Sequence, residues 1–252
     1  MEVHAHTHTD PAHGGTSRKK WTHYLWEFLM LFLAVFCGFL AENLREYSVE
    51  HQKEKQFIVS LTEDLSADTA NLTVTIKSYD RMELKLDTVL KMYRKLGTGY
   101  NDTLRRNLYV VKGFPDFIYT DRTMQQLKNS GGMRLIRHKL ASDGIVGYDS
   151  KVKDLGIDVD GLNEVFLQIE HLWYEMFDEE DLLLDKKSKS IAELEKGNKN
   201  YLLISDKATL GKLNNEIMDY RDVCGFVKKQ EIELKQKAIA LISLLKKGYH
   251  LK

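Results

Sequence analysis

The chain has 252 residues, and its 37 basic and 37 acidic side chains give a formal net charge of zero. Nucleic-acid-binding proteins usually carry a strong basic excess, so this balance argues against a nucleic-acid partner. Two cysteines exclude a disulfide framework, and two prolines are fewer than a loop-rich or all-β fold normally needs. The composition therefore favours an all-α protein.

Residues 1–20 form a polar tail that ends in three consecutive basic side chains. The tail contains four histidines, and histidine-rich tracts can bind Zn, Ni or Cu through imidazole nitrogens. These histidines are His4, His6, His8 and His13. A tract of this kind lacks the fixed geometry and the supporting hydrogen bonds of a dedicated metal site. We therefore predict a disordered cytoplasmic tail with only weak candidate metal ligands, and no cofactor.

Residues 21–41, WTHYLWEFLMLFLAVFCGFLA, contain one charged side chain, Glu27. About 20 predominantly apolar residues suffice to cross the hydrocarbon core of a bilayer. Trp21, Tyr24 and Trp26 lie at one end of the segment, as is typical of aromatic anchors at a membrane interface. The sequence predicts a transmembrane helix over residues 21–41.

Two kinds of processing signal are alternatives to this anchor. A cleaved signal peptide has a shorter apolar core and a small-x-small cleavage site. In the nearest candidate site, Phe39-Leu40-Ala41, a phenylalanine occupies a position that requires a small residue. Cys37 could indicate a lipoprotein, but Phe36 before it is too bulky for that processing. We therefore expect an uncleaved anchor.

The charges on either side of the apolar segment predict its orientation. Arg18, Lys19 and Lys20 precede the segment, whereas mixed charges follow it. Because short basic flanks tend to stay in the cytoplasm, we expect a cytoplasmic N-terminus and an extracytoplasmic C-terminal body. Lys53 and Lys55 lie not far beyond the segment and reduce the contrast.

Four residues of the segment share one face of the expected helix: Glu27, Ala34, Gly38 and Ala41. Small residues on one face allow two membrane helices to approach closely. An ionisable group in a span can also mark a proton or ion path, although one span offers no path by itself. We interpret the four residues as a helix–helix contact face, the alternative being an accident of composition.

The body, residues 42–252, contains three apolar seams with helical spacing. The first repeats every seven residues. Companion positions are filled by Leu61, Met82, Val89 and Leu96 and are interrupted at Asp68 and Thr75. It predicts a long helix over about 42–96, ended by a Gly-Thr-Gly sequence. Its members are Ile58, Leu65, Leu72, Tyr79, Leu86 and Tyr93.

The second and third seams alternate gaps of three and four residues. They run from Ile145 to Met176 and from Leu210 to Leu245, and only Glu231 interrupts the third. They predict helices over about 134–177 and 206–247. Four glycines lie beside the second seam, where close helix packing or a kink could explain them: Gly144, Gly147, Gly156 and Gly161.

The three predicted helices fit an elongated antiparallel bundle with short connector helices. In this out–back–out arrangement the connector 97–132 caps the end distal to the membrane. The connector 178–205 lies nearer the membrane, and the C-terminus is distal. An intermolecular coiled coil is the alternative.

Within the connectors, Thr120 is the predicted N-cap of a short helix that Gly131-Gly132 ends. The acidic run at 178–181 lacks the spacing and the glycine turn of an EF-hand, and we interpret it as a solvated loop.

Motifs for catalysis are absent from the sequence. It contains no nucleophile elbow, no His-Glu-x-x-His zinc motif and no phosphate-binding glycine loop. Cys224 occupies a seam position and reads as a small core residue. We therefore expect no enzyme activity.

Two stretches resemble a family of uncharacterised bacterial single-pass membrane proteins. The first is EFLMLFLAVFCGFLAEN followed by EHQKEKQFIVSLTEDLSADT, and the second is TMQQLKNSGGMRLIRHKLASDGIVGYDSKVKDL. The second contains the counterpart of the family's "ELK-SG-LRLI" element at Gln126-Leu127-Lys128, Ser130-Gly131 and Arg134-Leu135-Ile136. Together they cover about a third of the chain. The resemblance implies a bacterial inner-membrane anchor and implies no catalytic residues.

These features predict a non-enzymatic membrane-anchored scaffold or interaction protein of the bacterial cell envelope. Its expected partners are the lipid bilayer and either a second copy of the chain or another envelope protein. An extracytoplasmic sensor is the alternative. A 20-residue tail is too short to be an output domain, so a sensor would need a partner that supplies the output.

Overall fold

The structure is a computed structural model that describes residues 17–96, 102–178 and 202–251. Among these residues it has five α-helices and no β-strand, apart from an isolated bridge between Phe177 and Leu202. The prediction of an all-α protein is confirmed for the described residues.

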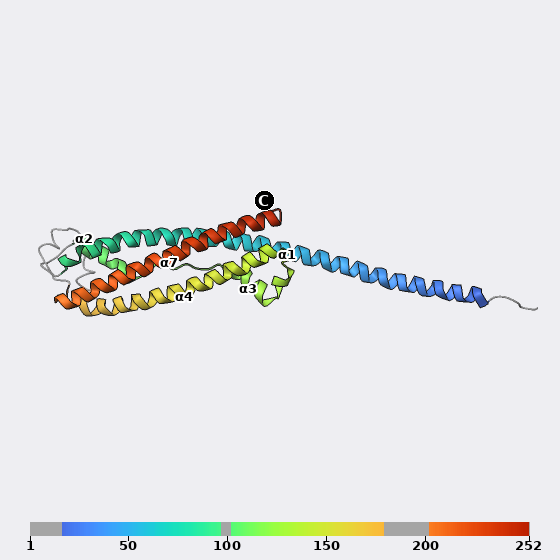
Figure 1. Cartoon of the computed structure of the whole chain (residues 1–252), viewed down its shortest axis with the longest axis horizontal. Coiled ribbons are helices and arrows are strands. Elements are labelled where there is room, and N and C mark those ends of the chain that lie inside the picture. The colour runs from blue at the N-terminus through green and yellow to red at the C-terminus, as the bar shows by residue number, and fades with distance from the viewer. Residues whose placement is uncertain (1–16, 97–101, 179–201, 252) are drawn as a thin grey trace, which may run out of the picture. The chain divides into compact units, whose positions relative to one another are not determined.

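The chain divides into two compact units, Met1–Lys53 and Glu54–Lys252. Helix α1, Ser17–Met92, contributes to both (Figure 1). In the described part of the first unit, every side chain from Trp21 to Val49 is exposed. These residues therefore form no core of their own.

The second unit is built from the remainder of α1 and two further long helices, α4 and α7, which pack together (Figure 1). Its helices after α1 are, in chain order, η1 Tyr93–Lys95, α2 Asp102–Leu108, η2 Tyr109–Lys112, α3 Arg122–Asn129, η3 Gly132–Leu135, α4 Lys139–Met176 and α7 Lys207–Gly248. The prediction of three long helices is confirmed.

The predicted seams form the core of the second unit. Leu72 on α1, Leu162 on α4 and Val227 on α7 have no exposed surface. Val152, Val159 and Phe166 on α4 are partly buried and pack against this core. Because all three seams are covered within one chain, the intermolecular coiled coil is not needed to bury them.

The direction of the helices differs from the prediction. Glu54 and Asp68 of α1 bond to the backbone N–H of Arg137 and the hydroxyl of Tyr148, so α1 and α4 run in the same direction. In contrast, Thr75 contacts Glu231 and Asp87 contacts Arg221, so α7 runs antiparallel to α1. The out–back–out arrangement is therefore wrong.

An extended connector makes the parallel arrangement possible. Residues 113–121 contain no helix, and they run back along α1. The hydroxyls of Tyr79 and Tyr220 donate to the carbonyls of Pro115 and Gly113, while Asp68 accepts the N–H of Thr120. Nine extended residues cover about 30 Å, so α4 begins beside the Glu54 end of the unit.

Because α7 runs antiparallel to α1, the C-terminus and the second connector also lie at other ends of the bundle than predicted. The hydroxyl of Tyr249 donates to Glu54, so α7 ends at the Glu54 end of the unit. The second connector joins Met176 to Lys207 at the opposite end, where Lys207 lines a hollow together with Tyr93. The predicted positions of these two features within the bundle are therefore exchanged.

The ends of the helices show which local signals operate. The second long helix begins at Lys139 instead of 134, because η3 precedes it and the His138 imidazole caps it by accepting the N–H of Ala141. The predicted short helix is present as α3, and Gly131 follows it with a left-handed φ of 65°. Thr120 is not its N-cap, since Asp121 occupies that position.

The glycines of α4 do not share one explanation. A Cβ atom at Gly144 would lie 2.8 Å from the Leu241 side chain, so this glycine permits close packing with α7. At Gly147 the nearest atom, on Lys237, would be 3.5 Å away, which is an ordinary contact. Gly156 and Gly161 have no neighbouring atom within 4 Å of such a Cβ. Close packing therefore explains one of the four positions.

Candidate membrane anchor and contact face

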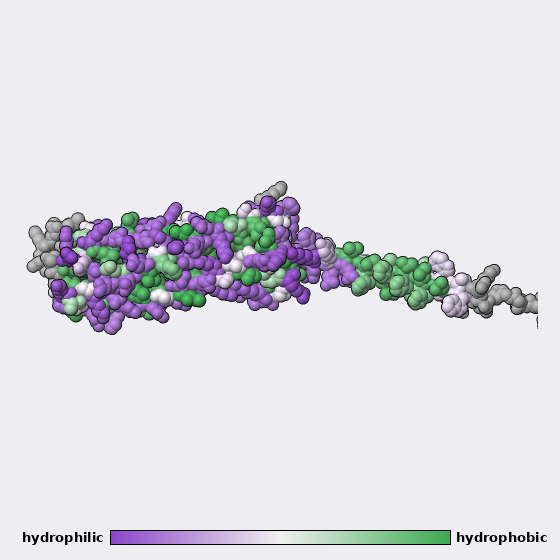
Figure 2. Space-filling view, viewed as in Figure 1, coloured by the Kyte–Doolittle hydropathy of each residue, from purple (hydrophilic) through white to green (hydrophobic). Residues whose placement is uncertain are grey.

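The apolar part of α1 is the first candidate functional site. In the described residues, α1 is the one helix long and apolar enough to cross a membrane, and none of its apolar window is buried. Figure 2 shows this part as a continuous hydrophobic surface. An N-terminal signal sequence can satisfy the same criterion of length and hydropathy, so the anchor is argued below from further features.

Two faces of this helix differ in side-chain size. Phe28, Phe32 and Phe36 stack at spacings of four residues, with ring centroids 6.3 and 5.9 Å apart. At about 100° per residue, Ala34 and Gly38 lie roughly 140° around the helix from this aromatic row. A Cβ atom at Gly38 would meet no atom within 4 Å. The single chain therefore leaves the small-residue face uncovered.

All four predicted contact-face residues lie within the described helix. Helix geometry places Glu27, Ala34, Gly38 and Ala41 within an arc of about 60°. Glu27 also has a partner that the sequence analysis missed, because its carboxylate lies 3.2 Å from Nε2 of His23. Spacing of four residues on a helix is the signal that could have revealed this pair.

Two buried acids of α1 hold the connector that precedes α4. The Asp64 carboxylate accepts hydrogen bonds from Nε of Arg122 at 2.5 Å and from the backbone N–H of Thr123 at 3.0 Å. Asp64 therefore caps the N-terminus of α3 from another helix. Glu54 accepts the N–H of Arg137 at 2.8 Å and the Tyr249 hydroxyl at 2.6 Å. Sequence reasoning did not assign a role to either acid. Their arrangement is structural, because every contact named here fixes chain segments.

Asp68, predicted only as an interruption of the first seam, has the same role. Its carboxylate accepts the N–H of Thr120 at 2.8 Å and the hydroxyl of Tyr148 at 2.7 Å. Burial raises the pKa of Asp68, while these hydrogen bonds act in the opposite direction. A carboxylate at a seam position is therefore compensated by specific donors, as buried polar groups require.

The other two seam interruptions pair with each other. The Thr75 hydroxyl donates to Oε2 of Glu231 at 2.6 Å, between α1 and α7. Oε1 of Glu231 is fully buried and has no hydrogen-bond partner within the described part of the chain. Burial raises the pKa of Glu231 to about 7, the negative charge of Asp116 adds to the shift, and the Thr75 hydrogen bond opposes it. The core thus contains a carboxyl group that titrates near neutral pH.

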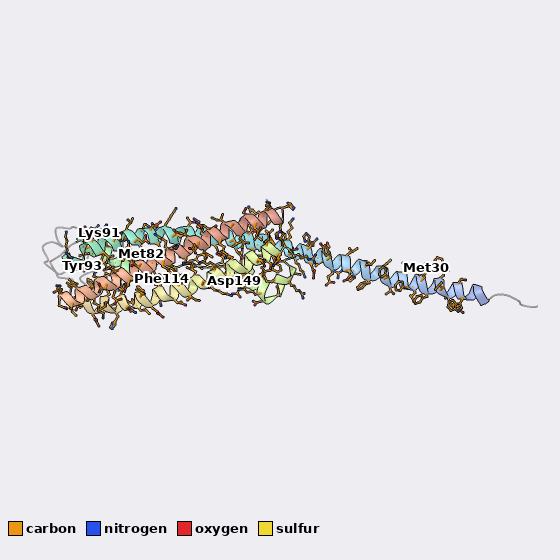
Figure 3. All side chains as sticks on the ribbon, viewed as in Figure 1. Met30, Met82, Lys91, Tyr93, Phe114 and Asp149 are labelled. Atoms are coloured by element: carbon orange, nitrogen blue, oxygen red, sulfur yellow. The ribbon has the colours of Figure 1, made fainter. Side chains whose placement is uncertain are left out.

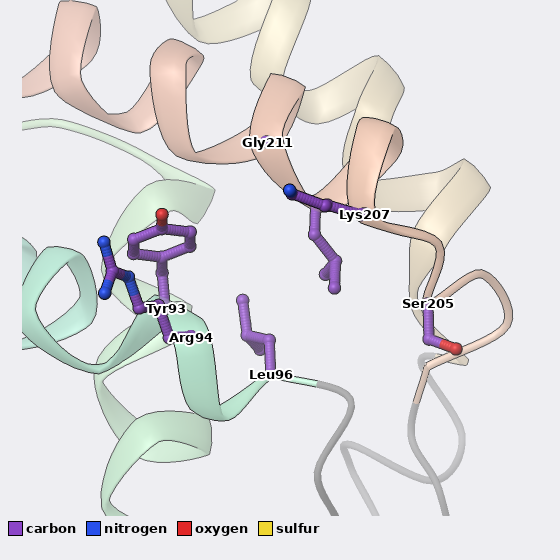
Figure 4. A pocket seen from close by; sticks show the side chains of 7 residues that line it. Tyr93, Arg94, Leu96, Ser205, Lys207 and Gly211 are labelled. Carbon is purple, nitrogen blue, oxygen red and sulfur yellow. The ribbon is translucent and has the colours of Figure 1, made fainter.

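A hollow of about 470 Å³ lies where α1 and α7 meet at the end of the unit opposite Glu54 (Figure 4). Among the residues that the structure describes, its lining combines apolar, hydroxyl and cationic side chains, without a carboxylate, cysteine or histidine. The residues are Tyr93, Arg94, Leu96, Ser205, Lys207, Leu210 and Gly211.

The residues that the structure describes offer no metal cluster, and the thiol in the core is buried. These residues contain no group of three or more potential ligands. The candidates His4, His6, His8 and His13 lie outside them. Cys224 is fully buried, which confirms its assignment to the core, and burial raises the pKa of its thiol to about 12. A thiol in this state is a poor nucleophile.

Comparison of the chain with protein-family models, with curated proteins and with solved structures gives no match. Its function is therefore argued from the apolar helix and the bundle.

Proposed function

We propose that the protein is a non-enzymatic, single-pass membrane scaffold of the bacterial cell envelope that self-associates through Glu27, Ala34, Gly38 and Ala41. The observation that carries this proposal is an apolar helix surface that is exposed throughout and has small residues on one face. The proposal includes membership of the single-pass family that the sequence resembles, a cytoplasmic N-terminus and an extracytoplasmic bundle.

The exposure of residues 21–41 supports a bilayer as the first partner. Burying one large apolar side chain stabilises a protein by about 1.5–3 kcal/mol. Trp21, Phe28, Leu31 and Phe39 are each at least 60 % exposed, and the same holds along much of the segment. The hydrocarbon core of a membrane covers all sides of such a helix at once, whereas a groove in a protein covers one face.

The small-residue face supports a second copy of the chain as the other partner. Lipid tails solvate bulky and small side chains similarly, so helices associate in membranes where their backbones can approach closely. The face that contains Ala34 and Gly38 permits this approach, and the row of Phe28, Phe32 and Phe36 on the other side remains in contact with lipid. The bundle would then present its outer surface to an envelope partner.

A matched pair of substitutions tests self-association of the full chain in proteoliposomes, by energy transfer between labelled copies. Gly38→Leu adds bulk to the proposed contact face and is expected to weaken association about tenfold, equivalent to about 1.4 kcal/mol. Val35→Leu adds bulk elsewhere on the same helix and is expected to leave association unchanged. Equal association of Gly38→Leu and the unmodified chain would remove the contact face from the proposal.

A second measurement tests orientation and partner class. Reporter fusions at the C-terminus, one active only in the cytoplasm and one only outside it, are expected to show an extracytoplasmic C-terminus. Purification in mild detergent, followed by mass spectrometry, is expected to recover an envelope protein. Recovery of a tightly bound small molecule without any protein partner would instead favour the sensor.

A further inference from the structure

The end of the second unit at Glu54 carries a cluster of basic side chains that the proposed anchor does not explain. Glu54 binds both Arg137 and Tyr249, and the rings of His138 and Tyr249 are 6.3 Å apart. The start of α4 and the end of α7 therefore meet here. Six exposed basic residues gather around these contacts and are called the basal cluster: Lys55, Arg134, Arg137, Lys139, Lys246 and Lys247.

The chain segments that carry the basal cluster contain more basic than acidic side chains. Residues 54–60, 132–143 and 244–251 contain the six basic side chains and two acids, Glu54 and Asp143, which leaves a formal charge of +4. Glu54 is buried, whereas Asp143 lies 3.3 Å from Lys139 in an exposed pair that contributes little. Leu140 is 63 % exposed within this end of the unit.

Chain length keeps the basal cluster within reach of a membrane. Twelve residues separate Ala41 from Glu54. At 3.3–3.6 Å per residue they extend to about 43 Å at most, and as a helix they cover about 18 Å. If residues 21–41 cross a bilayer, this tether keeps Glu54 within about 43 Å of the headgroups, whatever the direction of the bundle, so the basal cluster can reach them.

We propose that the basal cluster binds the headgroups of anionic phospholipids in the membrane that holds residues 21–41. This inference rests on the membrane anchor proposed above. A Lys or Arg near an anionic membrane surface strengthens binding about fivefold, and salt screens the attraction over about 10 Å. Four net positive charges at one end of a tethered domain bind an anionic surface cooperatively. The exposed Leu140 side chain then enters the interfacial region of the bilayer.

The full chain reconstituted in vesicles provides the test. Vesicles contain either phosphatidylcholine alone or phosphatidylcholine with about 30 % phosphatidylglycerol, a composition chosen to supply a strong negative surface potential. Acetylation rates of individual lysines are measured by mass spectrometry. Lys139, Lys246 and Lys247 are expected to react several-fold more slowly in anionic vesicles, and high salt is expected to remove the difference. Lys207, at the opposite end of the unit, serves as the internal reference.

A pair of double variants assigns the effect to the basal cluster. Lys246→Gln with Lys247→Gln removes two of the six charges and is expected to weaken binding about 25-fold, so that Lys139 loses its protection. Lys207→Gln with Lys212→Gln removes the same charge at the other end and is expected to preserve the protection of Lys139.

Three results would overturn the inference, and they are distinguishable. If the chain floats with vesicles after an alkaline wash but its basal lysines react equally in both lipids, the anchor stands and the basal cluster does not bind lipid. Equal protection in both lipids indicates a protein contact and overturns the inference in the same way. If the chain fails to float with either vesicle, both the anchor and the inference fail.

Discussion

The two parts of α1 differ in how their apolar side chains are distributed around the helix and in how far they are exposed. In the first unit, apolar side chains surround the helix and remain exposed, as Met30 shows at 63 %. In the second unit they form one stripe that the chain itself covers, as at Met82, which is 4 % exposed (Figure 3). A helix that is apolar on all sides needs cover on all sides, from lipid or from protein, whereas a stripe needs only one packing partner. The distribution of apolar residues around one helix therefore reports which environment each part needs.

The largest expected effect on stability comes from comparing a leucine-to-alanine substitution in the two parts of α1. Leu72→Ala removes a fully buried side chain and is expected to destabilise the bundle by about 2–5 kcal/mol. Leu33→Ala removes an exposed side chain of the first unit and is expected to leave bundle stability unchanged. Urea unfolding of the full chain in detergent measures both. Equal losses would mean that residues 21–41 belong to the folded core.

The pH dependence of stability tests the buried carboxyl group of Glu231. Its folded pKa of about 7 lies above the ordinary value of 4.5, so the folded state holds a proton that the unfolded state has released. The contribution of this group to the free energy of unfolding is therefore largest below about pH 4.5. It decreases as the pH rises to about 7, and the total loss is about 3 kcal/mol.

Two variants isolate the contribution of Glu231 to this profile. Glu231→Gln is expected to flatten the profile between pH 5 and 7, values that bracket the titration. Glu164→Gln, at an exposed position of α4, is expected to leave it unchanged. A profile that keeps its slope in Glu231→Gln would assign the pH dependence to another group.

A smaller effect is expected from the acids that hold the connector. Tyr148→Phe removes the donor to a buried oxygen of Asp68 and is expected to cost about 1–3 kcal/mol, because that oxygen loses its partner. Asp87→Ala breaks a partly exposed pair with Arg221 and is expected to cost at most about 1 kcal/mol. Chemical denaturation ranks the two, and a reversed order would contradict the role given to Asp68.

The smallest effect concerns the glycines of α4. Gly156→Ala and Gly161→Ala are each expected to stabilise the helix by about 1 kcal/mol, because the added methyl group meets no atom. In a domain of this size that raises the melting temperature by about 2–4 °C. Gly144→Ala gains less or loses stability, since Leu241 must move. Calorimetry of the three variants would contradict this account if Gly144→Ala were the most stable.

The sequence predicted which residues form the core but not how the helices connect. Seam residues such as Leu72 and Val227 are recognisable because helical spacing carries the same signal in any bundle. That spacing contains no information about direction, so the parallel course of α1 and α4 was missed. The signal that could have revealed this course is the helix-free stretch that begins Gly113-Phe114-Pro115. It is long enough for the chain to return along the bundle. Asp68 was a second signal, because a buried carboxylate needs donors from elsewhere.

The candidate site was predictable only as a pattern on one helix. The spacing of Ala34 and Gly38 places them on one face in any α-helix, and this required no tertiary information. The basal cluster could not be predicted in this way, because Arg134 and Lys247 lie more than 100 positions apart in the sequence. They approach each other only because α7 returns to Glu54, and that return depends on the connector that sequence analysis placed wrongly.

The return of α7 to Glu54 also has a consequence for the order of events during synthesis. The seams of α1 and α4 are completed by α7, whose last buried residue is Leu245. Until those residues have been made, Leu72 and Leu162 lack part of their cover, while the apolar segment at 21–41 has long been available. The open seams of α1 and α4 therefore stay exposed until α7 has been made, and transiently exposed apolar surface of this kind favours aggregation.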